Sequence, residues 1–144
     1  MTVRTLRSWD GPQGHNFDLP LDSLDILQIK IDYAITFVFE DGSDLRIEEA
    51  VKFREPGQAE LYISPNTQQS LWGPVLMTVN TSLVAATASE RGKLSLTFEG
   101  GRELIVEPSE RYEAWSFNRA TGQLLISMPG GSLAYFPGTA GRTE

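Results

Sequence analysis

Two segments of the chain are versions of one sequence. Residues 35–49 read ITFVFEDGSDLRIEE and residues 94–108 read LSLTFEGGRELIVEP, at a constant offset of 59 residues. In each copy an alternating apolar stretch leads into a turn that contains glycine, and a second alternating stretch follows. This is the pattern of a β-hairpin. Its recurrence predicts a fold that is built from two related antiparallel hairpin units.

The alternation also predicts the length of the turn in each copy. Residues directly opposite one another in an antiparallel pair point to the same face of the sheet. A three-residue loop at 40–42 places Phe37 opposite Leu45, whereas a two-residue loop would place Arg46 there. The same rule gives a loop at 99–101 in the second copy. We therefore predict a type I turn with a G1 bulge in both, with the last loop glycine in the left-handed conformation.

The rest of the chain is predicted to be mainly β with one short helix. Residues 29–39 alternate without interruption, which is typical of one long half-buried strand. The helix is expected within residues 68–79, where Pro74 suits a first turn and Gly73 argues against one continuous helix. Such alternation is typical of antiparallel sheets, so we expect a sandwich or a partly open barrel. Further strands are expected at residues 61–63, 83–88, 112–117, 123–128 and 132–136.

The chain is predicted to form one domain, because no linker or low-complexity segment divides it. The domain is expected to span residues 24–136. Residues 1–23 are rich in glycine, proline and polar side chains and predict an irregular arm. Residues 137–144 offer nothing to bury, so we expect a frayed tail there.

Charge and cysteine content limit the function classes open to the chain. Its 144 residues carry a net charge of −7, which disfavours contact with phosphate backbones and therefore nucleic-acid binding. There is no cysteine, and no apolar run reaches the roughly 20 residues of a membrane span. The first residues also lack the apolar core of a secretory signal. We expect a cytoplasmic protein with no membrane partner.

Catalytic and metal-binding motifs are absent from the sequence. His15 is the single histidine, and neither a G-x-S-x-G nor an HExxH pattern occurs. We therefore predict no catalytic residue, no cofactor and no metal ligand. Paired carboxylates remain an alternative, because two acids are enough for glycosidase-type chemistry. The candidates for such a pair are Asp32, Glu48, Glu110 and Glu113.

The same acids are candidates for binding a protein partner, together with one aromatic residue. Asp32 and Glu48 fall on the polar face of their predicted strands. Glu113 and Trp115 share one side of the predicted strand at 112–117. Trp115 is either a core residue or a partly exposed anchor beside Glu113. The predicted partner-binding set is Asp32, Glu48, Glu110, Glu113 and Trp115.

Five short segments carry a family resemblance: IDYAIT (31–36), FEDG (39–42), GKLSLTF (92–98), YEAW (112–115) and PGGSLA (129–134). With them the chain resembles a family of small bacterial proteins, common in actinobacteria, that carry a domain of unknown function. The resemblance covers most of the chain and brings no catalytic residue with it. More loosely, a small, acidic, cysteine-free protein is similar in kind to the immunity proteins that neutralise toxins.

Three function hypotheses follow from these observations. The first is a non-catalytic immunity-type inhibitor that covers a basic toxin domain with an acidic, aromatic face. The second is a small-ligand-binding domain with a pocket lined by Tyr33, Phe37, Leu96 and Trp115. The third is a carboxylate-based enzyme. In each case we expect a monomer or a weak homodimer that pairs strand edges within residues 123–136.

Overall fold

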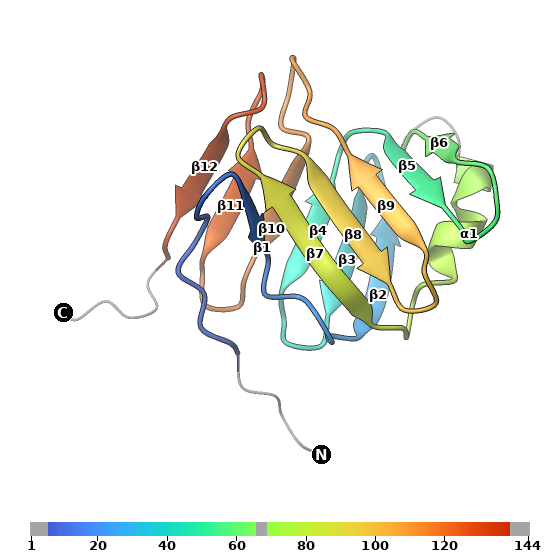
Figure 1. The fold of residues 1–144 in the computed structure, drawn as a ribbon, viewed down its shortest axis with the longest axis horizontal. Coiled ribbons are helices and arrows are strands. Elements are labelled where there is room, and N and C mark those ends of the chain that lie inside the picture. Colours follow the sequence, from blue (N-terminus) through green and yellow to red (C-terminus); the bar gives the residue numbers. More distant parts are fainter. Residues whose placement is uncertain (1–5, 66–68, 139–144) are drawn as a thin grey trace.

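Two antiparallel sheets of six strands face one another in the computed structural model, which describes residues 6–65 and 69–138 (Figure 1). The predicted β-rich sandwich is therefore confirmed. The first sheet has the order β1 (Asn16–Asp18), β7 (Leu83–Ser89), β8 (Leu94–Phe98), β9 (Glu103–Val106), β5 (Val51–Arg54) and β6 (Leu61–Ile63). The second has the order β12 (Leu133–Phe136), β11 (Leu124–Ser127), β10 (Trp115–Asn118), β4 (Asp44–Ile47), β3 (Ile35–Phe39) and β2 (Ile26–Ile31).

The two halves of the chain exchange strands between the sheets. Strands β2, β3 and β4 form a meander in the second sheet, but β5 then crosses to the first sheet and pairs with β9. Strands β7, β8 and β9 form the matching meander in the first sheet, and β10 crosses back to pair with β4. Each sheet therefore contains strands from both halves, which ties the duplicated units into one sandwich.

The repeated unit is longer than the hairpin that the sequence revealed. Strand β2 carries a register shift between Ile26 and Gln28, and β7 carries one between Leu83 and Ala85. Both shifts occur where the strand meets the last residue of the next strand, Phe39 or Phe98. The first strand of each half thus has the same β-bulge, although its sequence is not visibly repeated.

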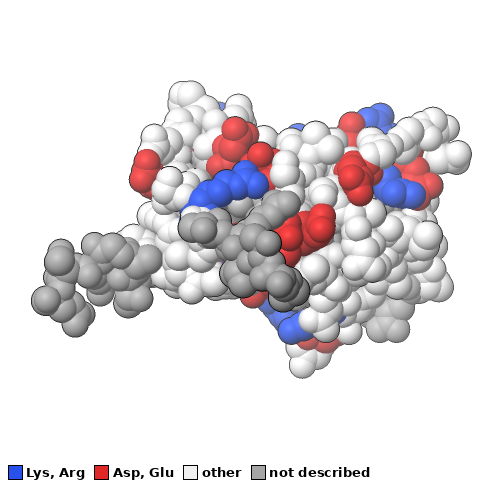
Figure 2. Space-filling model, turned by 90° about the horizontal axis from the view of Figure 1, so that it is seen from below, with Lys and Arg blue, Asp and Glu red and all other residues white. Residues whose placement is uncertain are grey.

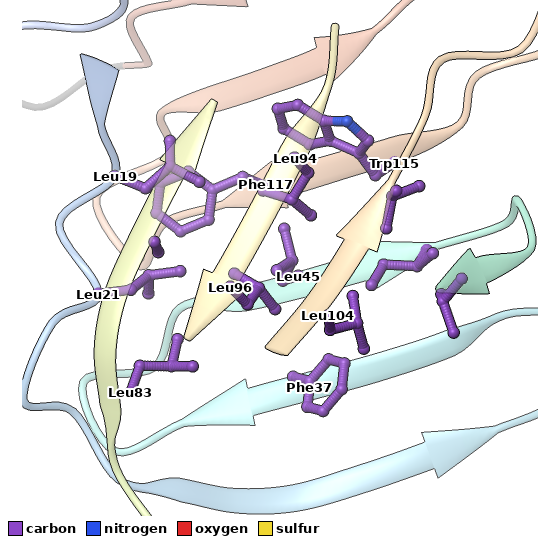
Figure 3. Packing of buried hydrophobic residues seen from close by; sticks show 14 of the residues in the cluster. Leu19, Leu21, Phe37, Leu45, Leu83, Leu94, Leu96, Leu104, Trp115 and Phe117 are labelled. Carbon is purple, nitrogen blue, oxygen red and sulfur yellow. The ribbon is translucent and has the colours of Figure 1, made fainter. Parts of the chain in front are cut away.

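The predicted hairpin register is confirmed in both copies. Phe37 pairs with Leu45, and Leu96 pairs with Leu104. All four side chains are buried in the space between the sheets (Figure 3). Burying a leucine or phenylalanine side chain contributes about 1.5–3 kcal/mol. A slip by one residue would expose the whole apolar face, so the register follows from the alternation.

The two turns have the predicted length but not the same backbone conformation. Gly42 has a φ of +86° and its N–H donates to the Phe39 carbonyl at 3.0 Å, as expected for the predicted bulge. In the second copy Gly100 and Gly101 both have positive φ, at +89° and +91°. A type I turn requires a negative φ at the position of Gly100. The prediction of a type I turn is therefore wrong for the second copy, where glycine replaces Asp41.

The same three-residue loop recurs in hairpins outside the repeat. In each, the N–H of the third loop residue, a glycine, donates to the carbonyl of the residue before the loop. This glycine has a positive φ in every case. The loops of this kind are 40–42, 90–92, 99–101, 120–122 and 129–131.

The prediction of one strand over residues 29–39 is wrong. The chain turns at residues 32–34, and β2 pairs back on β3 with Ile31 opposite Ile35. Asp32 stabilises this turn, because its Oδ1 accepts the Ala34 N–H at 2.8 Å. A three-residue loop keeps the residues on either side of it on the same face. The alternation of apolar and polar residues therefore continues through the turn, so the turn cannot be recognised from this pattern. Tyr33 lies at the tip of the loop and is exposed.

The N-terminal arm is part of the sandwich and the expected boundary at residue 24 is too late. Strand β1 pairs with β7, and Leu19 and Leu21 lie in the core. Trp9 makes edge-to-face contacts with Phe117 and Tyr135, at centroid distances of 5.6 and 5.5 Å. The arm thus closes one open end of the core. Residues 139–144 of the expected frayed tail lie outside the described residues.

The predicted helical region forms as two short pieces. A 3₁₀ turn (Gln69–Trp72) runs into α1 (Gly73–Leu76), which has proline in its first turn as predicted. Trp72 and Val75 anchor this region in the core. No helix in the described ranges has the length and apolarity needed to cross a bilayer.

Candidate functional site

The acids predicted to bind a partner lie on three connections at one end of the sandwich. Asp32 belongs to the β2–β3 turn, and Glu48 to the β4–β5 connection. Glu110 and Glu113 belong to the β9–β10 connection. All four side chains are exposed. The three connections lie together at the top of Figure 1, so the tertiary structure gathers these residues at one end.

Trp115 does not belong to this surface, and its prediction as a partner-binding residue is wrong. Strand β10 begins at Trp115, which pairs with Ile47 and points into the core (Figure 3). Its side chain is 1% exposed. The indole Nε1 donates a 2.8 Å hydrogen bond to the Gly92 carbonyl. The polar end of the ring is therefore satisfied inside the protein and offers nothing to a partner.

The predicted ligand pocket is also not formed. Phe37, Leu96 and Trp115 all belong to the hydrophobic core and are at most 1% exposed. Tyr33 lies instead at the tip of the β2–β3 turn, where it is 75% exposed. The four residues line no common cavity, because the turn carries Tyr33 away from the face that the other three share.

The structure places a hollow of about 290 Å³ among the three connections. Two tyrosines, Tyr33 and Tyr112, and two glutamates, Glu48 and Glu49, contribute to its lining. The other lining residues are Ala50, Ser64 and Pro65. Its chemical character is therefore aromatic and acidic. We call it the first hollow.

A second hollow, of about 280 Å³, adjoins the first. The two share Glu49 and Ala50 as lining residues. Tyr62 and Glu107 line the second hollow together with Lys52, whose Nζ lies 3.8 Å from a Glu107 carboxylate oxygen. This ion pair offsets part of the acidic charge of the second hollow, whereas the first hollow has no basic residue among those that line it.

Glu49 connects the two hollows through specific contacts. One oxygen of its carboxylate, Oε1, accepts the Tyr112 hydroxyl at 3.0 Å and the Ala50 N–H at 2.8 Å. Desolvation raises the pKa of Tyr112 above its ordinary value of 10.0, and the hydrogen bond and negative charge of Glu49 raise that pKa further. Both effects favour the protonated phenol, which donates its hydrogen bond to Glu49.

Together these residues form a surface that we call the tyrosine–glutamate edge. It consists of Tyr33, Tyr62, Tyr112, Glu48, Glu49 and Glu107. The three tyrosines are 75%, 62% and 43% exposed, in that order. Of this set, sequence reasoning placed Glu48 in the partner-binding set and Tyr33 in the predicted ligand pocket. The sequence pattern that could have indicated this surface is a tyrosine next to an acidic residue in a connection between strands, as in Asp32-Tyr33 and Tyr112-Glu113.

The opposite end of the sandwich also carries acidic side chains, some of them in ion pairs. Figure 2 shows basic side chains beside acidic ones on that face. Arg54 pairs with Glu103 at 2.8 Å, and Arg102 pairs with Glu55 at 3.3 Å. Such exposed pairs contribute little to stability, and acidic side chains still outnumber basic ones on this face in Figure 2. What distinguishes the tyrosine–glutamate edge is therefore its exposed tyrosines beside carboxylates, not an excess of negative charge.

Two of the groups considered in the sequence analysis, Asp32 and His15, form ion pairs. Asp32 faces Arg46, with a carboxylate oxygen 3.7 Å from the guanidinium. His15 pairs with Glu90 at 2.5 Å beside β1, away from the tyrosine–glutamate edge. Within the described ranges, no group of three or more histidines or carboxylates is placed to hold a metal ion.

Comparison with known proteins places the chain in a family. Residues 17–137 match the model of a family of unknown function, DUF6188. The chain belongs to this family. The expected kinship with a domain of unknown function is therefore confirmed, and every residue of the tyrosine–glutamate edge lies within the matched region. Neither a curated protein nor a solved structure shows significant similarity to the chain.

Proposed function

We propose that this protein is a non-catalytic binding protein whose tyrosine–glutamate edge docks on a basic region of another protein. The observation that carries the proposal is the exposure of Tyr33, Tyr62 and Tyr112 around Glu48 and Glu49. Exposed tyrosines are enriched where proteins bind one another, because they bring a large apolar area and a polar tip. Soluble proteins rarely expose such groups together without a binding role.

Charge complementarity supports a basic partner in particular. The chain has a net charge of −7, so its field attracts a cationic protein over a distance of about 8–10 Å at physiological salt. Long-range attraction of this kind speeds association, while the desolvated aromatic contacts slow dissociation. The acids of the edge therefore select the partner and orient it, and the tyrosines supply most of the affinity.

The finer form of the proposal is an immunity-type inhibitor in the cytoplasm. Its partner is a basic toxin domain, and inhibition results from covering the toxin's active site. This mechanism needs a rigid acidic surface and no chemistry of its own. The sandwich supplies the rigidity, because the β4–β5 and β9–β10 connections each join strands of different sheets.

The test is binding to the products of neighbouring genes, measured by calorimetry with the purified full-length chain. The double variant Glu48→Lys/Glu49→Lys is expected to bind the cognate product at least about tenfold more weakly, with a smaller dependence on salt. The control is Glu99→Lys, which changes the charge of the β8–β9 loop at the opposite end. If no neighbouring product binds, or if the two variants bind equally well, the proposal fails.

A further inference from the structure

The first hollow has the composition of a site for an organic cation. Tyr33 and Tyr112 stand on separate connections and line the hollow from the β2–β3 turn and the β9–β10 connection. The face of an aromatic ring attracts a cation through its quadrupole, and several rings around one cation act together. A pair of tyrosines across a hollow therefore favours a positively charged group with apolar or planar surface.

The carboxylates of the first hollow add to this preference. Glu48 and Glu49 follow one another in the chain, and both line the hollow. Glu49 uses its Oε1 to hold Tyr112 and the Ala50 N–H. The exposed Glu48 carboxylate has no hydrogen bond or ion pair to another of the described residues. It is therefore available to a ligand, while Glu49 keeps the ring of Tyr112 in place.

The neighbouring hollow provides an internal comparison. It also has a tyrosine and two glutamates, but Lys52 lines it and lies 3.8 Å from Glu107. The ammonium group of Lys52 offsets the negative charge of Glu107, as a bound cation would do in that hollow. The first hollow has the same ingredients without such an internal cation among its lining residues.

We propose that the first hollow binds the guanidinium group of an arginine side chain on the basic partner. A guanidinium stacks on aromatic faces and meets a carboxylate through two parallel N–H donors, so it uses both kinds of wall. An ammonium group pairs with a carboxylate only as a compact, strongly hydrated point charge, and it lacks a planar surface to stack on a ring. The hollow of about 290 Å³ is large enough for the planar group and its last methylene. This inference rests on the proposed function and names the partner group that the edge recognises.

The experiment is a titration of the isotope-labelled full-length protein, followed by the amide chemical shifts of residues 33, 48, 49 and 112. The probes are an arginine-containing tripeptide, its lysine analogue, ethylguanidinium chloride and tetramethylammonium chloride, with sodium chloride as the ionic control. The arginine peptide is expected to bind most tightly, with saturable shifts confined to the first hollow. Shifts no larger than those with sodium chloride would overturn the inference. Tighter binding of tetramethylammonium than of the arginine peptide would also overturn it.

Matched variants separate the aromatic and the acidic contributions. Tyr33→Leu and Glu48→Gln are each expected to weaken binding of the arginine peptide about fivefold to tenfold. Phe136→Leu, which changes an exposed aromatic residue of β12 outside the edge, is expected to leave its affinity unchanged. Equal binding by all three variants would refute the site. The titration with the arginine peptide needs no protein partner. If the peptide binds but no neighbouring-gene product does, that result contradicts the proposed function and not the guanidinium site. A complex that is insensitive to Tyr33→Leu would contradict the guanidinium site alone.

Discussion

Ser82 donates a 2.6 Å hydrogen bond from its Oγ to Oδ1 of Asp25, and the two residues hold equivalent places in the two halves of the sandwich. Each directly precedes the first residue of the bulge in its half. The Glu40 N–H donates to the Asp25 carbonyl at 3.0 Å, and the Glu99 N–H donates to the Ser82 carbonyl at 2.9 Å. The duplicated units therefore meet side by side at this pair, which also forms an isolated antiparallel bridge.

The Asp25–Ser82 contact makes a measurable prediction. Ser82→Ala removes the donor and leaves a half-buried carboxylate oxygen without its partner. Hydrogen bonds to charged groups are worth about 1.5–3 kcal/mol when buried, so a loss of about 1 kcal/mol is expected at this half-buried site. Chemical denaturation measures the loss as a lower midpoint at constant m-value. A matched substitution is Ser95→Ala on β8, which is expected to change the free energy of unfolding by less than about 0.5 kcal/mol. Equal effects would show that the contact is not stabilising.

Two neighbouring glycines in the β11–β12 loop are expected to respond very differently to alanine. A Cβ at residue 131 would lie 2.5 Å from the Arg91 carbonyl oxygen, whereas a Cβ at residue 130 would meet nothing within 4 Å. Both have positive φ, at +98° and +86°. Gly130→Ala is therefore expected to lower the free energy of unfolding by about 1–2 kcal/mol, which is the cost of placing a residue with a Cβ in the left-handed conformation. Gly131→Ala also forces the loop away from residue 91, and we expect a loss of more than about 3 kcal/mol. Thermal unfolding of the two variants compares them directly, and similar melting temperatures would contradict the close approach.

The arm is expected to contribute to stability through Trp9. Its ring packs on Phe117 and Tyr135, and its carbonyl accepts the Gln123 side-chain N–H at 2.8 Å. Trp9→Ala keeps the backbone contact but removes the half-buried ring, so a loss of about 2 kcal/mol is expected. Arg7→Ala serves as the control, because it removes only exposed contacts with Asp22, namely the ion pair and a hydrogen bond to the Asp22 carbonyl. An exposed pair is worth about 0–1 kcal/mol. Unfolding in denaturant measures both, and an unchanged Trp9→Ala variant would show that the arm does not close the core.

The ionisation of Tyr112 is expected to depend on Glu49. Desolvation raises the pKa of Tyr112 above 10.0, followed by the hydrogen bond and charge of Glu49. Because folding favours the protonated phenol, its stabilising effect is complete below the unfolded-state pKa and is lost as the pH rises through the folded-state pKa. Glu49→Gln removes the charge of residue 49, so the pKa of Tyr112 is expected to fall but to stay above its ordinary value. Ultraviolet titration of the phenolates measures the change.

Two further variants assign and control that titration. Tyr112→Phe identifies the phenolate that ionises at the higher pH. Glu107→Gln changes an acid of the second hollow that makes no hydrogen bond to Tyr112. An equal fall of the Tyr112 pKa in Glu107→Gln and Glu49→Gln would mean that the hydrogen bond from Tyr112 to Glu49 has no specific effect.

The hairpins of the repeat were predictable from local pattern. Strict alternation leaves one register in which Phe37 meets Leu45 and Leu96 meets Leu104. The same reasoning failed at residues 32–34, because a turn of odd length preserves the alternation that was used to detect strands. It also placed the start of the domain too late, because Leu19 and Leu21 are buried by strands that lie far away in the sequence.

The candidate site was less accessible to sequence reasoning than the fold. Glu48 was identified through its place on a polar face, but the contact of Glu49 with Tyr112 joins residues 63 positions apart. Trp115 beside Glu113 suggested an exposed anchor, yet pairing with Ile47 turns its ring toward the core. No local signal distinguishes these outcomes, because they depend on which strand becomes the neighbour of β10.

The amino-acid sequence by itself determined the hairpins, since alternation and left-handed glycines act over a few residues and leave one low-energy pairing. Only the tertiary structure decided that β5 and β10 cross between the sheets. That exchange brings the β2–β3, β4–β5 and β9–β10 connections to one end, and with them Tyr33, Glu49 and Tyr112. The physical reason is that each sheet buries its apolar face against the other, and the choice of neighbouring strands depends on contacts between residues far apart in the sequence. The tyrosine–glutamate edge is the surface that this shared burial leaves exposed.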